Sequence, residues 1–391
     1  MISEAPTIIP TDDRSVNGPT LDEATGPEPE WNSVLRESRE WHGLILILGA
    51  SDTGKTTFCT ELVKVGVAER MRVGVVDADV GQSEIGPPGC VSLAMPEHPF
   101  QRLSDLRAVA SAFVGSVTPQ FAQVEHLAAV CRIVHEARVR DARMIVCDTT
   151  GMADTRWSVR LKEAKLSALD PDRVVLMIRP RRGETPDQAA DAAYGWLART
   201  LRTARRPSLH IVQTDPAVRI RSQAMRAQRR AWKFGKALEG AEPRTWHLDD
   251  VALRGTWIGS GRSVPVPGLR QLSGRLGCGI GYAETVRNRL CVVADRAVDR
   301  DDLASAAMQL YGISQTALTL AANLDGLLVG LYDGDDRMLG LGILERLDSA
   351  RRQITLRTAI HSYAMTSTIR FGQVRLAPNG DPIGFIRDGD V

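Results

Sequence analysis

The sequence feature that most constrains the fold is the stretch GASDTGKTT at residues 49–57. It follows the continuously apolar run 44–48 and leads into a helix-like stretch from Lys55 to about Glu69. This is the pattern GxxxxGK(S/T) in the strand–loop–helix setting that the pattern requires. Its glycines let backbone N–H groups wrap around phosphates, and the helix N-terminus adds positive potential. The sequence therefore predicts a site for a nucleoside triphosphate.

Two residues of this motif have specific expected roles. Lys55 is predicted to reach the β and γ phosphates, and the Thr56 hydroxyl is predicted to hold Mg²⁺. The expected cofactors are thus ATP, or another nucleoside triphosphate, and Mg²⁺. The predicted nucleotide contacts are Gly49, Asp52, Thr53, Gly54, Lys55, Thr56, Thr57 and, from a later motif, Gln82.

Apolar runs alternate with helix-like stretches through the first 245 residues. Helices are expected at 120–138 and 155–169, and further buried strands at 73–76, 144–147, 174–178 and 209–212. Strands that alternate with helices indicate a mostly parallel sheet covered on both faces. The predicted fold class is α/β, with a P-loop NTPase domain built on a mostly parallel sheet.

After about residue 245, short apolar runs alternate with turn signals such as Asp333-Gly334-Asp335 and Asn379-Gly380. This pattern is typical of short strands, which we expect at 327–332, 339–344, 353–358 and 372–376. The sequence thus predicts a P-loop domain at 39–245 and a smaller β-rich C-terminal domain at 246–391.

The 391-residue chain has a net charge of only +2, but its charges are unevenly placed. Residues 1–30 hold seven acids, one base and five prolines, and we expect residues 1–38 to be a disordered acidic tail. Residues 219–236 instead carry seven basic side chains and no acid. The near-neutral total excludes a uniform polycation that coats nucleic acid, but it allows a local site for a polyanion.

The basic stretch 219–236 leaves three interpretations open. A charged helix face is usually just solvated, although opposite charges normally accompany it and none do here. Alternatively, its arginines form a lid that clamps transferring phosphates, or they line a groove for a nucleic-acid backbone.

The second apolar run leads into Asp77-Ala-Asp79-Val-Gly-Gln82. Two carboxylates two positions apart on a strand point the same way. Beside a P-loop, such a carboxylate either holds waters of Mg²⁺ or acts as a base for the attacking group, and the competing interpretation is a helix cap or turn residue. The predicted metal residues are Thr56, Asp77 and Asp79.

Other features narrow the class of protein. Where common GTPases carry NKxD, this chain reads Gln213-Thr214-Asp215-Pro216, which argues against a GTPase. No stretch approaches 18 apolar residues and no signal peptide is visible, so no membrane association is expected. The six cysteines are scattered without a CxxC pair, which indicates reduced thiols in a cytoplasmic protein.

Five segments together resemble one known family. They are GASDTGKTT, DADVGQSEIGPPG, FVGSVTP, CDTTGM and IRSQAMRAQRR, and they span about residues 43–240. The combination is similar to the P-loop polynucleotide 5′-hydroxyl kinases. That family includes the RNA kinase of the eukaryotic mRNA-cleavage and tRNA-splicing machinery, relatives that process ribosomal RNA, and archaeal polynucleotide kinases. A weaker similarity lies in GLYDGDDRMLGLGIL of the C-terminal domain.

The resemblance implies transfer of the γ-phosphate of a nucleoside triphosphate to the 5′-OH end of RNA or DNA. It implies that Asp79 activates the 5′-hydroxyl, that Asp77 supports metal waters and that Gln82 lies beside the phosphates. It further implies catalytic roles for Lys55 and for two lid arginines, Arg221 and Arg226. The implied substrate-binding clasp consists of Thr149, Thr150, Gly151 and Met152.

Met152 departs from the family pattern, because many relatives carry a tryptophan at this point. Stacking of an aromatic ring on a base is worth roughly 1–3 kcal/mol. Methionine packs less strongly on a base, so we expect weaker end-binding or another platform. Trp157 is a candidate platform, although a helix core residue is the competing interpretation.

Two other classes of function remain as alternatives. Some members of the family act as nucleotide-locked scaffolds that bind ATP tightly and serve mainly in assembly. Dimeric switch ATPases of the partitioning or metallochaperone kind also use a DxDxxQ strand, but they usually have lysine where this P-loop has Ala50.

Overall fold

The computed structural model describes residues 31–153, 155–215, 218 and 220–386, so the predicted acidic stretch 1–30 lies outside the described residues. The described chain begins with helix α1 (Trp31–Glu37) and the single turn η1 (Ser38–Glu40). Trp31 and Leu35 are buried, and the Trp31 ring lies 5.9 Å from the Phe58 ring. The predicted tail is therefore wrong for residues 31–38, because apolar contacts fold this segment onto the P-loop domain.

A seven-stranded sheet forms the centre of the P-loop domain, in the order β4-β3-β2-β5-β1-β6-β7. Strands β2, β5, β1, β6 and β7 run parallel, which confirms the mostly parallel sheet. Strands β3 and β4 are antiparallel and have no counterpart among the predicted strands. The strands are β1 (Gly43–Gly49), β2 (Val73–Ala78), β3 (Cys90–Ala94), β4 (Ala110–Phe113), β5 (Met144–Thr149), β6 (Arg173–Ile178) and β7 (Ser208–Gln213).

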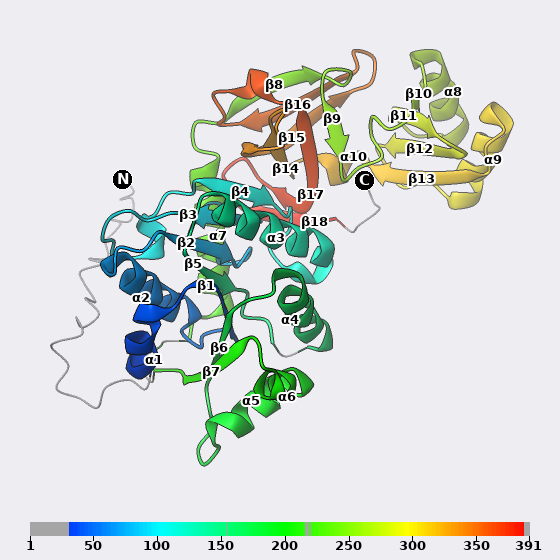
Figure 1. The fold of residues 1–391 in the computed structure, drawn as a ribbon. Helices are drawn as coiled ribbons and strands as arrows, with labels where there is room; N and C mark the ends of the chain where they lie inside the picture. Colours follow the sequence, from blue (N-terminus) through cyan, green and yellow to red (C-terminus); the bar gives the residue numbers. More distant parts are fainter. Residues whose placement is uncertain (1–30, 154, 216–217, 219, 387–391) are drawn as a thin grey trace, which may run out of the picture.

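Helices cover both faces of this sheet and make two separate apolar cores. α1 and α2 pack on one face, while α3, α4, α5 and α6 pack on the other (Figure 1). Because the parallel strands share one carboxyl edge, the loops after β1, β2 and β5 meet there. The helices are α2 (Lys55–Ala68), α3 (Gln123–Val139), α4 (Arg156–Leu169), α5 (Pro186–Tyr194) and α6 (Trp196–Thr203), with short turns η2 (Leu103–Asp105) and η3 (Pro119–Phe121).

The strand-rich C-terminal region is confirmed, but it contains two sheets rather than one. A mixed sheet has the order β18-β17-β14-β15-β16-β8, and β9 pairs with β17. Because β8 starts before residue 246, the predicted domain boundary falls inside a strand. The elements are β8 (Glu242–His247), β9 (Ala252–Arg254), α10 (Ala321–Leu324), β14 (Leu327–Tyr332), β15 (Met338–Asp348), β16 (Gln353–Thr358), η4 (Tyr363–Met365), β17 (Thr368–Leu376) and β18 (Pro382–Phe385).

The second C-terminal sheet is an α/β module inserted between β9 and β14. Its four strands lie in the order β10-β11-β12-β13 and share one apolar core with two helices. Figure 1 shows it at the far right, remote from the P-loop domain. Its elements are β10 (Arg262–Ser263), α8 (Val266–Leu276), β11 (Ile280–Val286), β12 (Arg289–Ala294), α9 (Arg300–Tyr311) and β13 (Gln315–Leu320).

Helix α7 (Gln223–Ala237) connects the P-loop domain to the mixed C-terminal sheet. Its Phe234 is fully buried in one apolar cluster with Phe113 of β4 and with Leu328 and Val374 of the C-terminal sheet. Residues 223–236 of the basic stretch therefore lie in a helix whose second half is anchored between two sheets.

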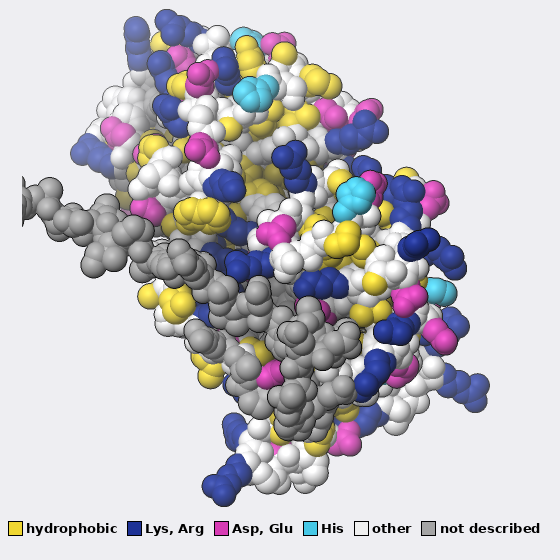
Figure 2. Space-filling model, turned by 90° about the vertical axis from the view of Figure 1, so that its left-hand side faces the viewer, with side chains coloured by type: hydrophobic (Ala, Val, Ile, Leu, Met, Phe, Trp, Pro, Cys, Tyr) yellow, Lys and Arg dark blue, Asp and Glu magenta, His cyan; other side chains and the backbone are white. Residues whose placement is uncertain are grey.

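Among the described residues, no helix is long and apolar enough to cross a membrane. Figure 2 shows Lys and Arg side chains spread over one face of the molecule, with Asp and Glu side chains among them. On this face the positive charge is thus distributed rather than gathered into one broad patch, which matches the small net charge.

Candidate active site

The P-loop joins β1 to α2 at the carboxyl edge of the sheet. Gly54 has a φ of 84°, in the left-handed region that glycine adopts without a Cβ penalty, and it directly precedes the first residue of α2, Lys55. The Lys55 ammonium donates a 2.7 Å hydrogen bond to the Ala50 carbonyl of the same loop. The Thr53 hydroxyl donates to that carbonyl as well, at 2.9 Å. The loop is therefore closed on itself, with its helix N-terminus free for phosphate.

An acidic residue that the sequence analysis did not select completes this centre. Asp148, the second-last residue of β5, accepts a 2.7 Å hydrogen bond from the Thr56 hydroxyl. Its other oxygen, Oδ1, is buried and has no hydrogen-bond partner among the described residues. Burial raises the pKa of Asp148 to about 6, although Lys55 and the Thr56 hydroxyl oppose that rise. The signal for it was available, since a buried apolar strand that ends in aspartate is typical of P-loop proteins.

Asp77 orders the loop that follows β2. Its carboxylate accepts backbone N–H groups from Asp79 at 3.1 Å, from Ile85 at 2.8 Å and from Glu84. Burial, with Asp148 nearby, raises its pKa well above the usual aspartate range. Asp77 thus has a structural role in this loop, and its role toward metal waters stays a prediction.

Asp79 lies at the start of this loop and faces the P-loop lysine. Its Oδ1 accepts backbone N–H groups from Gly81 and Gln82, both at 3.1 Å. Burial lowers the pKa of Lys55, and the charges of Asp148, Asp79 and Asp52 oppose that effect. The charges of three carboxylates, from the P-loop, from β5 and from the loop after β2, therefore act on one buried ammonium.

The first half of α7 docks against these loops. Arg226 forms an ion pair with Asp52 of the P-loop, and its backbone carbonyl accepts a 3.1 Å bond from Gln82 Nε2. One turn on, Arg229 pairs with Glu84. The Lys233 ammonium donates to the Glu84 carbonyl at 2.8 Å. These contacts favour the interpretation of the basic stretch as a lid over its interpretation as a solvated helix face.

The two arginines predicted for the lid differ in position. Arg226 reaches the P-loop, whereas Arg221 precedes the helix and is exposed, so its role stays a prediction. Arg230 was missed. It is half-buried and its guanidinium is close enough to Asp79 for the two charges to interact, while burial lowers its pKa. Its Nε has no partner among the described residues. The spacing of four from Arg226 places both on one helix face and could have indicated it.

The predicted clasp follows β5 and lies against the P-loop. The Thr149 hydroxyl donates 2.7 Å to the Ile47 carbonyl of β1 and is buried, so it stabilises the sheet. A Cβ on Gly151 would come within 2.7 Å of the Ser51 Cα, so only glycine allows this close approach. The Met152 sulfur lies 3.7 Å from the Thr118 hydroxyl. Substrate contacts of the clasp stay a prediction.

The remaining predicted residues are placed at the same edge. Asp52 has a φ of 58° and its side chain pairs with Arg226 of α7, while Thr57 is exposed on the first turn of α2. Trp157 lies in the first turn of α4 and is only half-buried, so neither of its two interpretations is decided.

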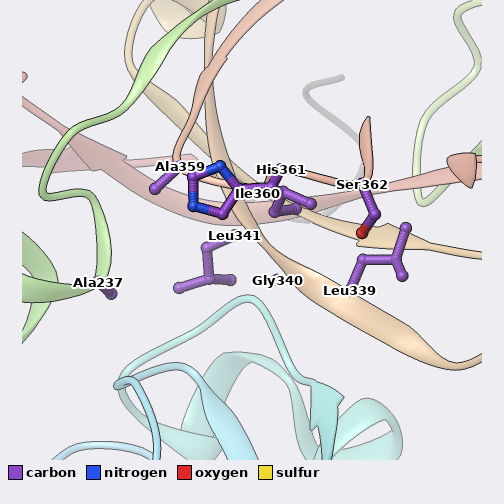
Figure 3. Close-up of a pocket in the computed structure, with 8 residues that line it drawn as sticks. All are labelled: Ala237, Leu339, Gly340, Leu341, Ala359, Ile360, His361 and Ser362. Atoms are coloured by element: carbon purple, nitrogen blue, oxygen red, sulfur yellow. The ribbon is translucent and has the colours of Figure 1, made fainter. Parts of the chain in front are cut away.

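A cavity of about 410 Å³ lies elsewhere, at the far end of α7 (Figure 3). Eleven residues separate its lining residue Ala237 from Arg226, which is about 16 Å along a helix. It contains no acid, lysine or arginine and is not a phosphate site. It is lined by Ala237, Leu339, Gly340, Leu341, Ala359, Ile360, His361 and Ser362.

Comparisons with known proteins agree with this geometry. Residues 49–236 match the family model described as mRNA cleavage and polyadenylation factor CLP1 P-loop. A polyribonucleotide 5′-hydroxyl-kinase of Pyrococcus abyssi is 27% identical over 348 residues, covering 88% of this chain and 90% of the relative. A polyribonucleotide 5′-hydroxyl-kinase of Methanocaldococcus jannaschii is 26% identical over 355 residues, covering 88% and 89%.

A solved structure supports the architecture. Wild-type Clp1p in its complex with Pcf11p superposes with a TM-score of 0.54 at 10% identity, covering 88% of this chain and 77% of that chain. At this identity the likeness concerns the fold alone. The segment that matches the family model contains the P-loop, the Asp79 loop, the clasp and most of α7. Both archaeal relatives are named as polyribonucleotide 5′-hydroxyl-kinases. Over residues 49–236, this chain is similar to the CLP1 P-loop family.

Proposed function

We propose that this protein is a polynucleotide 5′-hydroxyl kinase that transfers the γ-phosphate of ATP, or of another nucleoside triphosphate, to the 5′-OH end of RNA or DNA. One observation carries the proposal: Arg226 of α7 pairs with Asp52 of the P-loop that bears Lys55, and Gln82 of the Asp79 loop donates to the Arg226 carbonyl. A phosphate-binding lysine, a candidate base and a lid arginine thus converge from separate elements.

The chemistry needs little covalent help from the protein. The 5′-hydroxyl oxygen attacks the γ-phosphorus, Asp79 accepts the hydroxyl proton, and the bond between the γ-phosphorus and the bridging oxygen breaks to release the nucleoside diphosphate. Most of the barrier is lowered by positioning and by positive charge around the transferring group. Lys55 supplies that charge from the P-loop, and Arg226 and Arg230 supply it from the lid.

The site also fits a magnesium ion. The Thr56 hydroxyl and the unpartnered Asp148 Oδ1 are oxygen donors at the end of the P-loop, and Mg²⁺ prefers one or two such groups together with phosphate oxygens and waters. In the described part of the chain no three acidic, histidine or cysteine side chains form a metal cage, which agrees with this mode. When bound, the ion would neutralise charge on the β and γ phosphates.

The proposal also includes RNA as the preferred acceptor and a cytoplasmic location, and each rests on a separate observation. The archaeal relatives are named as polyribonucleotide kinases, which favours RNA as the acceptor. All six cysteines are unpaired thiols, which supports a cytoplasmic location.

The test is incubation of the protein with γ-labelled ATP and single-stranded 5′-OH oligonucleotides of RNA and of DNA. We expect label at the 5′ end of the oligonucleotide, with an oligonucleotide that already carries a 5′-phosphate as the control acceptor. ATP binding without any labelled oligonucleotide would instead indicate the scaffold alternative. Phosphate release without an acceptor, stimulated by dimerisation, would indicate a switch ATPase.

A further inference from the structure

Two buried lysines lie on α4, directly behind the clasp, and the proposed chemistry does not use them. Lys162 and Lys165 are 2% and 1% exposed. An ammonium taken out of water needs compensating acceptors, because its desolvation is costly. What each ammonium contacts therefore indicates why the chain retains a charge there.

Lys162 reaches back to the loop that precedes its own helix. Its ammonium donates to the Met152 carbonyl at 2.6 Å and to the Thr150 carbonyl at 3.2 Å. Helical side chains point toward the helix N-terminus, so a lysine two turns into α4 is well placed for this contact. Between these two carbonyls, the Gly151 carbonyl instead accepts from the Ser51 hydroxyl of the P-loop, at 3.3 Å. The clasp is thus held from both sides.

This arrangement determines where the clasp N–H groups point. In a trans peptide the N–H points opposite to the carbonyl of the preceding residue, and neither peptide concerned is cis. Because the Thr150 and Met152 carbonyls face Lys162, the N–H groups of Gly151 and Ala153 point away from α4. In the described part of the chain, neither of these N–H groups takes part in a hydrogen bond.

We infer that Lys162 is a positioning residue that sets two clasp N–H groups, those of Gly151 and Ala153, to bind phosphate oxygens of the acceptor strand. The inference rests on the proposed kinase function and adds the part of the acceptor that the clasp recognises. Backbone N–H groups suit the anionic phosphate next to the 5′-terminal nucleoside. Recognition by backbone donors is independent of base identity, and it does not need the aromatic ring that Met152 replaces.

The first experiment uses Lys162→Met, which keeps the apolar stem and removes the ammonium. The variant loses both hydrogen bonds from the ammonium to the clasp carbonyls, so the clasp N–H groups should no longer be held in place. We therefore expect the KM for a 5′-OH oligoribonucleotide to rise on the order of tenfold. The Kd for ATP should change by less than about twofold. Lys165→Met is the matched control for the KM, since Lys165 is equally buried one turn later and makes no hydrogen bond to the clasp.

An unchanged KM in Lys162→Met would overturn the inference. An equal rise of the KM in Lys165→Met would overturn it too, because the effect would then come from the loss of any buried lysine. Lys162→Arg keeps a cationic donor and should restore part of the lost affinity.

The second experiment needs no variant and remains decisive if Lys162→Met does not fold. Wild-type protein is given an oligoribonucleotide with a neutral methylphosphonate at its first internucleotide linkage, or one without the 5′-terminal base. We expect the methylphosphonate to raise the KM about tenfold or more and the abasic end to change it less. The reverse order would show that the clasp reads the base and would refute the phosphate assignment. Absence of transfer to the unmodified oligonucleotide would refute the kinase proposal itself.

Discussion

The lid and the clasp both contact the P-loop, but the contacts that hold them differ. The lid is α7, which is held by ion pairs at Asp52 and Glu84, by hydrogen bonds that involve Gln82 and Lys233, and by an apolar cluster at Phe234. The clasp is held by backbone carbonyls, two of them bound to a buried lysine. Partly exposed ion pairs are weak and easily exchanged, whereas buried hydrogen bonds to an ammonium are costly to break. From this difference we predict that the ion pairs of α7 exchange more easily than the hydrogen bonds that hold the clasp.

The largest effect is expected at Asp79, whose charge interacts with Lys55 of the P-loop and with Arg230 of α7. Asp79→Asn removes the proton acceptor but keeps an oxygen for the N–H groups of Gly81 and Gln82, so the loop should persist. We expect the transfer rate to fall about 10²–10⁴-fold. Single-turnover label transfer measures it, and calorimetry should show ATP binding nearly intact. A fully active variant would move the base to another residue.

The anchor of the lid can be tested through Phe234. Phe234→Ala leaves a cavity where the side chain was fully buried between two sheets, so the free energy of unfolding should fall by about 3–5 kcal/mol. Urea denaturation provides the measurement. Trp232→Ala on the same helix is the control, because Trp232 is 61% exposed and its loss should cost less than about 1 kcal/mol. Equal effects of the two variants would contradict the anchoring role of α7.

The catalytic end of the lid is tested through Arg226. Arg226→Ala breaks the ion pair with Asp52 and removes a positive charge near the transferring phosphate, so the rate should fall about 10²–10³-fold. The affinity for ATP should change less than the rate. Arg199→Ala, an exposed arginine on α6, controls for the loss of one positive charge. Unchanged turnover in Arg226→Ala would return α7 to the interpretation of a solvated face.

The smallest expected effect is the contribution of Lys165, the second buried lysine of α4, to the pH dependence of stability. Burial lowers the pKa of Lys165 from 10.5 to about 8. Below pH 8 the folded protein therefore holds a buried ammonium, which costs free energy relative to the solvated ammonium of the unfolded chain. Between pH 8 and 10.5 the unfolded state binds more protons, and the free energy of unfolding should therefore rise with pH. The rise attributable to Lys165 is up to about 3 kcal/mol.

Chemical denaturation of wild type and Lys165→Met across this pH range measures that rise as a difference between the two proteins. Other groups that titrate in the same range cancel in the difference. Parallel pH curves for the two proteins would show that Lys165 has the same pKa in the folded and the unfolded chain.

Sequence patterns predicted the P-loop at the centre of the site because neighbouring residues in the chain form it. The apolar run 44–48, Gly54 and Lys55 specify a strand, a left-handed turn and a helix start within a dozen residues. The parallel strands followed from periodicity for the same reason. The antiparallel pair β3 and β4 was missed, because short strands without strict alternation become visible only through their pairing.

Other features of the site and the fold were not predicted, because they depend on contacts between residues that are distant in the chain. Asp148 meets Thr56 from 92 residues away, and Arg226 meets Asp52 from 174 residues away. The mixed C-terminal sheet pairs β8 with β16 across an inserted α/β module, so the local turn signals indicated strands but not two sheets. The orientation of the clasp N–H groups likewise depends on where α4 places Lys162.

By itself the sequence determined that this protein has a P-loop, a mostly parallel sheet and a basic segment, because each is encoded by spacing within one short stretch. Only the tertiary structure decided that a helix of the basic segment docks on the P-loop, that Asp77 binds the backbone of the loop after β2, and that the buried Lys162 ammonium binds two clasp carbonyls. Those outcomes depend on burial and on contacts across the sheet edge, and burial and long-range contacts are properties of the folded chain.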